Sequence, residues 1–122
     1  MVDTRRRKYA LLTLAFIGLC SQLLLAHAII MSSTPAPNSK VKGPDVDISL
    51  RYNVRIDGSR SRLQLMTPDG SSMPLTIAKQ DAQQVLQSKA SGLKPGAYEL
   101  QWNVLASDGH MSKGKVPFMV IE

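Results

Sequence analysis

The sequence contains very little cysteine and histidine, and these shortages narrow its possible chemistry. Cys20 is the single cysteine, and His27 and His110 are the only histidines. Because Cys20 lies in an apolar run near the start, a domain that begins after this run has no disulfide and no thiolate ligand or nucleophile. The chain also lacks a CxxC pair, an HExxH motif, a glycine-rich phosphate loop and a serine in a nucleophile elbow.

The sequence also lacks a long run of one charge beyond its first residues. Its net charge is +6, from 15 basic and 9 acidic side chains. Four basic residues at 5–8 and the acidic Asp3 precede residue 27; without them 11 basic and 8 acidic side chains remain, a net charge of +3. These remaining charges are scattered along the chain, which argues against a nucleic acid as the partner.

Residues 1–26 are predicted to form a signal-peptide helix that is cleaved after export. The basic start precedes an apolar run at 9–25, and small residues follow at Ala26 and Ala28. An uncleaved membrane anchor is an alternative, because the run is nearly long enough to span a bilayer. Cleavage after Ala28 is a second alternative, and it would remove His27 from the mature protein.

The rest of the chain, residues 27–122, is predicted to be one β domain. Apolar and polar side chains alternate in three stretches, 46–54, 62–66 and 98–104. In a fourth stretch, 116–121, Val116, Phe118 and Val120 alternate with Pro117, Met119 and Ile121. Residues 29–31 and 75–77 predict two further short strands, and residues 79–91 fit either a helix or a strand. Turns are predicted at Asp57-Gly58, at 68–70 and at 94–96. Short alternating strands separated by such turns indicate an antiparallel sandwich or barrel.

A possible metal site comprises His27, Asp108 and His110. If His27 is the first residue of the mature protein, its α-amine and its imidazole can chelate one metal ion together. Such groups have pKa values of about 7.7–8.0 and about 6.5, so a metal can displace their protons near neutral pH. His110 would add an imidazole, and Asp108 an oxygen ligand or a hydrogen bond to a ring. Nitrogen-rich sites of this kind suit Cu(II) before Ni(II) or Zn(II).

Simpler interpretations of these residues also exist. Asp-Gly is a common turn dipeptide, and a histidine after it can simply face solvent. Methionine is a soft ligand for Cu(I), but the methionines of the mature chain are dispersed, and only Met111, beside His110, is a candidate ligand. Trp102 lies on the apolar side of its stretch and is assigned to the core.

The two ends of the mature chain resemble the CopC family of copper-resistance proteins. The N-terminal resemblance consists of His27-Ala28, the segment 33–36, Pro44 and the strand 46–52. The C-terminal resemblance consists of Leu93, Pro95-Gly96, Tyr98, Trp102, Asp108-Gly109-His110, Gly114 and Phe118-Met119-Val120. Residues 55–90 match weakly. The segment 52–55 also departs from a Phe-x-Glu-Pro stretch that many members carry.

The resemblance implies a Greek-key β sandwich or barrel of about seven strands, similar to immunoglobulin and cupredoxin folds. It implies cleavage after Ala26 and a Cu(II) site formed by His27, Asp108 and His110. No Cu(I) site is expected, because a methionine-rich loop is absent.

The function expected from the resemblance is that of a periplasmic copper carrier or buffer in copper homeostasis and resistance, not an enzyme. An inner-membrane copper transporter is a possible partner. The alternatives are a copper-dependent oxidative enzyme that uses the same histidines, and a metal-free sandwich module that binds a protein.

Overall fold

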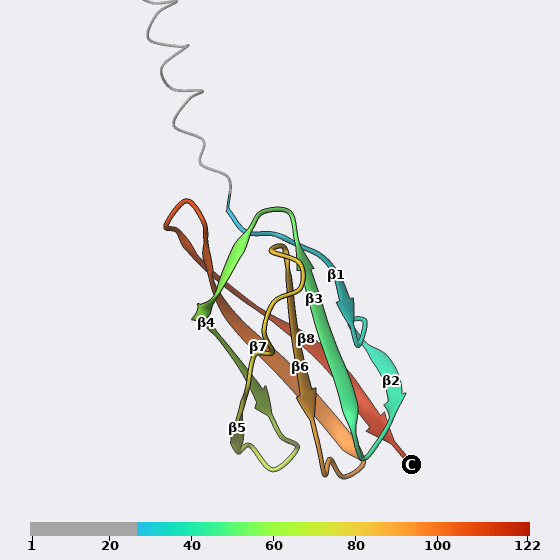
Figure 1. Cartoon of the computed structure of the whole chain (residues 1–122). Helices are drawn as coiled ribbons and strands as arrows, with labels where there is room; N and C mark the ends of the chain where they lie inside the picture. Colours follow the sequence, from blue (N-terminus) through green and yellow to red (C-terminus); the bar gives the residue numbers. More distant parts are fainter. Residues whose placement is uncertain (1–26) are drawn as a thin grey trace, which may run out of the picture.

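The computed structural model describes residues 27–122 and shows an all-β chain (Figure 1). The predicted signal-peptide helix at 1–26 lies outside the described residues. The eight strands are β1 (Ile30–Thr34), β2 (Ser39–Lys42), β3 (Val46–Tyr52), β4 (Ile56–Met66), β5 (Ser72–Leu75), β6 (Val85–Ala90), β7 (Gly96–Ala106) and β8 (Met111–Ile121). Within this part of the chain, no helix is long and apolar enough to cross a membrane.

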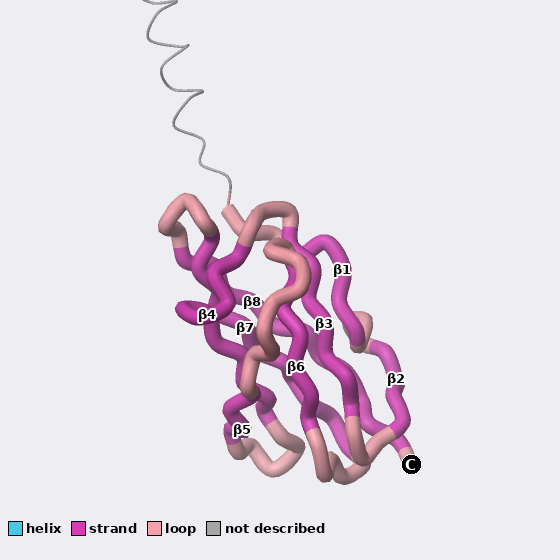
Figure 2. The backbone as a smooth tube through the Cα atoms, viewed as in Figure 1, coloured by secondary structure: helices cyan, strands magenta, loops and turns pink. Residues whose placement is uncertain are grey.

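The strands form two sheets. Figure 2 shows the strands in magenta and the loops that connect them in pink. One sheet has the order β1-β3-β6, and the other has the order β2-β8-β7-β4-β5. Neighbouring strands are antiparallel, except that β2 runs parallel to β8. The all-β prediction is therefore confirmed, with eight strands where about seven were expected.

The core lies between the two sheets and is built from the alternating stretches of the sequence. Every second side chain of β3 and of β7 is buried, because successive residues of a strand point to opposite faces. Leu50 from one sheet and Leu65, Leu100 and Val104 from the other are fully buried. Burial of side chains of this size stabilises a fold by about 1.5–3 kcal/mol each.

The turn predicted at Asp57-Gly58 was wrong, because both residues lie inside β4. The pairing of β4 with β7 shifts register between Asp57 and Arg62, so this part of the strand is irregular. The Ser61 hydroxyl donates a hydrogen bond to the Asp57 carbonyl (2.7 Å), and the Gly58 N–H donates to Oε1 of Gln80 (3.1 Å). These bonds satisfy backbone groups where the ladder is interrupted, so the chain continues as a strand instead of turning.

Three segments that are distant in the sequence meet at one end of the sandwich, at the top of Figure 1. They are the start of the described chain, the loop between β3 and β4, and the turn between β7 and β8. Backbone hydrogen bonds join them: Asn53 N–H donates to the Ile29 carbonyl (3.1 Å), and Ser107 N–H donates to the Arg55 carbonyl (3.0 Å). The β3–β4 loop therefore fixes the other two segments relative to each other.

Candidate metal centre

The turn between β7 and β8 presents Asp108 and His110. It is closed by hydrogen bonds from Ala106 N–H to the His110 carbonyl and from Gly109 N–H to the Ala106 carbonyl, both 2.9 Å. Gly109 has φ +89°, a left-handed conformation that glycine adopts without a steric cost. Oδ1 of Asp108 accepts a hydrogen bond from His110 N–H (3.0 Å). Asp108 therefore holds the backbone of the histidine that follows it.

The side chains of Asp108 and His110 also lie close together. Oδ2 of Asp108 is 3.3 Å from Nδ1 of His110, and about 40% of each side chain is exposed. The His110 N–H is the largest factor that lowers the pKa of the Asp108 carboxyl, and the imidazole adds a smaller contribution. Nδ1 is itself buried and makes no hydrogen bond within residues 27–122. This arrangement favours a proton on Nδ1 beside the carboxylate and leaves Nε2 as the nitrogen for a metal.

The start of the described chain brings His27 to this turn. The ring centroids of His27 and His110 are 6.3 Å apart, and the ring planes are nearly perpendicular, at 84°. Ala28, the next residue, is 6% exposed and belongs to the core, so the backbone that carries His27 is anchored. The structure thus brings together the two histidines that the sequence predicts to share a site.

Three metal-binding side chains do not converge on one point in residues 27–122. His27 and His110 face each other, whereas Asp108 contacts His110 from the side of Nδ1. Two imidazoles suit a soft or borderline divalent cation, and the donor set lacks one further strong ligand. An α-amine on His27 would supply it, but before cleavage this nitrogen belongs to the peptide bond with Ala26.

Asn53 is a residue near this site that the sequence did not single out. It follows the last residue of β3, and its side chain bonds to the backbone of the segment that carries His27. The only sequence signal was its position in the 52–55 segment, where the chain departs from the family pattern. Met111 is 51% exposed and Trp102 is buried, in agreement with a core position for the indole.

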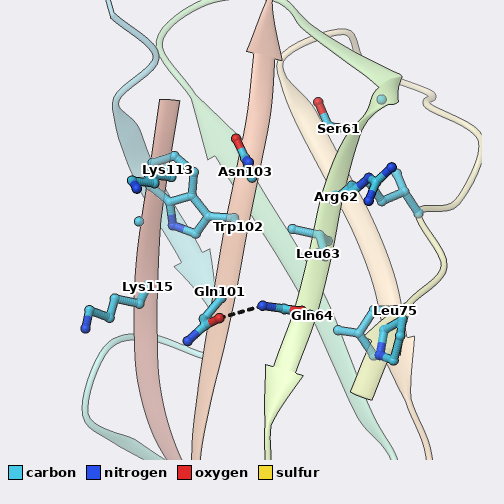
Figure 3. Close-up of a pocket in the computed structure, with 14 residues that line it drawn as sticks. Ser61, Arg62, Leu63, Gln64, Leu75, Gln101, Trp102, Asn103, Lys113 and Lys115 are labelled. Atoms are coloured by element: carbon cyan, nitrogen blue, oxygen red, sulfur yellow. Dashed lines mark hydrogen bonds between the residues drawn. The ribbon is translucent and has the colours of Figure 1, made fainter. Parts of the chain in front are cut away.

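A separate cavity of about 890 Å³ lies along β4, β5, β7 and β8 (Figure 3). Apolar side chains such as Leu63 and Leu75 line it together with basic ones such as Lys113. Nε2 of Gln64 donates a hydrogen bond to Oε1 of Gln101 (2.6 Å) beside it. None of the three predicted site residues lines this cavity. The candidate metal centre is therefore a surface site at the end of the sandwich.

The fold and the paired histidines define a small β-sandwich protein with a candidate metal site at one end. A family comparison matches residues 30–121 to the CopC domain, so the chain belongs to the CopC family. Protein YobA of Escherichia coli K12 is 31% identical over 123 residues, covering 98% of this chain and 99% of YobA. Copper resistance protein C of Pseudomonas syringae pv. tomato is 30% identical over 109 residues, covering 84% of this chain and 86% of that protein.

The solved structures agree with this assignment. CopC from Methylosinus trichosporium OB3b superposes with a TM-score of 0.72 at 25% identity, covering 77% of this chain and 93% of that structure. The family resemblance drawn from the two ends of the sequence is thus confirmed over nearly all of the described residues.

Proposed function

We propose that this protein is a periplasmic copper-binding protein that holds Cu(II) at His27 and His110 and acts as a carrier or buffer in copper homeostasis and resistance. The observation that carries the proposal is the perpendicular approach of the two imidazole rings, 6.3 Å apart. Membership of the CopC family and the relative named copper resistance protein C support copper as the cation.

The ligands in this proposal are the amine and imidazole of a mature N-terminal His27 and Nε2 of His110. Cleavage after Ala26 would create the amine one bond from the α-carbon of His27. Asp108 then either adds an oxygen ligand or stays beside Nδ1 and orients the imidazole ring of His110. The 3.3 Å separation of Oδ2 from Nδ1 favours the second role. Three nitrogens and at most one oxygen match the tetragonal preference of Cu(II).

A carrier is favoured over an enzyme because the histidines have no aromatic surface beside them for a substrate. The four aromatic side chains at 27–122, apart from the two histidines, are Tyr52, Tyr98, Trp102 and Phe118, and all are at least 92% buried. A site exposed at the end of the sandwich is also accessible to a protein partner, as transfer to an inner-membrane transporter would require.

Copper titration of the exported protein and its variants tests this function. His27→Ala and His110→Ala should each lower Cu(II) affinity by orders of magnitude, because each removes an imidazole nitrogen. Met119→Ala is the matched control, since it removes an exposed methionine at the other end of β8 and should leave the affinity unchanged. If both histidine variants bind Cu(II) as tightly as the wild type, the assignment of the site is wrong.

A further inference from the structure

We propose that Asn53 is a positioning residue, whose side-chain amide holds His27 opposite His110 and thereby sets the affinity of the site. The inference rests on the proposed function for its copper readout. The contacts that carry it are between Asn53 and the backbone at 27–29.

Asn53 contacts this segment through three hydrogen bonds. Its backbone N–H donates to the Ile29 carbonyl (3.1 Å), and its side-chain Oδ1 accepts from Ile29 N–H (2.7 Å). Its Nδ2 donates to the His27 carbonyl (3.3 Å). Both ends of the amide are therefore used, and they bond to the backbone on either side of Ala28.

The side-chain amide of Asn53 bonds to the chain at the point where the regular β ladder ends. The pairing of β1 with β3 reaches Ile30 opposite Tyr52, and its register shifts between Ile30 and Ser32. On the N-terminal side of Ile30 the chain is no longer part of β1. The backbone N–H and C=O groups of residues 27–29 therefore need hydrogen-bond partners outside the ladder. Asn53 supplies both a donor and an acceptor, which its side chain can do because it carries a carbonyl and an NH₂ group.

His27 depends on the side chain of Asn53 more than Ala28 and Ile29 do. Ala28 has its methyl group in the core, and Ile29 has a second bond, from the backbone N–H of Asn53, that does not involve the side chain. The backbone of His27 has the bond from Nδ2 of Asn53, and its ring meets His110. Without the Asn53 side chain, His27 would rotate about the backbone bonds next to Ala28, and metal binding would have to restrict that motion.

Asn53→Ala removes both side-chain bonds, and Asn53→Asp keeps the acceptor for Ile29 N–H but loses the donor to the His27 carbonyl. Asn103→Ala is the matched control, because Asn103 is an exposed asparagine of β7 that lines the separate cavity. Each exported protein is first shown to be folded by circular dichroism, then titrated with Cu(II) and studied by electron paramagnetic resonance. The metal-free proteins are studied by NMR, through cross-peaks between the His27 and His110 ring protons.

For Asn53→Ala we expect a Cu(II) affinity about 10–100-fold below wild type, the range found when groups that orient metal ligands are removed. Its resonance spectrum should change, and its cross-peaks between the two rings should weaken. Asn103→Ala should match the wild type in every readout. In Asn53→Asp, which keeps the Ile29 bond, weakened cross-peaks would locate the effect at the His27 carbonyl. If Asn53→Ala does not fold, the cross-peaks of Asn53→Asp decide the question.

The inference is overturned if folded Asn53→Ala keeps the wild-type affinity, spectrum and cross-peaks. A failure of the proposed function gives a different result, because the wild-type protein itself would then bind no Cu(II). In that case the NMR cross-peaks of the metal-free variants still decide whether Asn53 holds His27.

Discussion

The indole ring of Trp102 lies directly over Gly114, its partner in the ladder between β7 and β8. A Cβ atom on Gly114 would come within 2.7 Å of Cε2 of Trp102, closer than real Cβ atoms approach a neighbour. We therefore expect Gly114→Ala to lower the free energy of unfolding by about 1–3 kcal/mol, as overpacking of a core does. Urea denaturation followed by circular dichroism measures this change.

A double variant identifies the indole as the cause. Trp102→Phe removes the part of the ring that covers Gly114, so Gly114→Ala should cost less stability in that background than in the wild type. Equal costs in the two backgrounds would mean that the strain arises elsewhere, and a fully stable Gly114→Ala would contradict the close contact.

Two buried tyrosine hydroxyls are expected to respond differently to removal. The Tyr98 hydroxyl donates to the Lys94 carbonyl (2.8 Å), whereas the Tyr52 hydroxyl makes no hydrogen bond within residues 27–122. Burial raises the pKa of Tyr52 above its usual value. Tyr98→Phe should cost about 0.5–1.5 kcal/mol, and Tyr52→Phe should be neutral or stabilising, because it removes a desolvated polar group. Thermal unfolding measures the stability of both variants. A larger loss of stability in Tyr52→Phe than in Tyr98→Phe would contradict this account of the hydroxyls.

Asp69 is expected to titrate at unusually low pH. The Thr67 hydroxyl and Ser71 N–H (2.9 Å) donate to its carboxylate and lower its pKa to about 2. An unfolded aspartate has a pKa of about 3.9, so these bonds stabilise the fold above that pH. Their stabilisation is lost as the pH falls from about 4 towards 2, because the carboxylate becomes protonated. The side chain is exposed, so solvent keeps the effect on stability small.

An NMR titration of the Asp69 carboxyl measures this directly. Thr67→Val removes the hydroxyl with little change in size and should move the pKa back towards its usual value. A wild-type pKa near 3.9 would show that the turn does not hold the carboxylate in solution.

The alternating stretches could be predicted because burial of one face of the strand in the core determines their structure. β3 and β7 each bury one face, so their apolar side chains recur every second residue. In β8 the buried side chains of Val116, Phe118 and Val120 also alternate, although Met119 and Ile121 on the exposed face are apolar as well. β6 also buries alternate residues, including Ser88, whose hydroxyl donates to the Thr76 carbonyl (2.6 Å). This polar residue at a buried position explains why 79–91 fitted a helix as well as a strand.

The edge strands could be predicted only in part. β2 has four residues, two of them lysines, and it exists because it pairs with the edge of β8. No local pattern signals such a parallel pairing. The strand predicted at 29–31 begins one residue later as β1, and its apolar Met31 is exposed. The approach of His27 to His110 depends on long-range folding, so residue spacing alone could not give it.

Native mass spectrometry of the protein purified after export with copper tests the central claim most directly, because one spectrum gives both the first residue and the bound metal. We expect a chain of residues 27–122 carrying one Cu(II) ion, which is lost in His110→Ala. A chain that begins at Ile29, or one that begins at His27 and takes up no copper, would contradict the account.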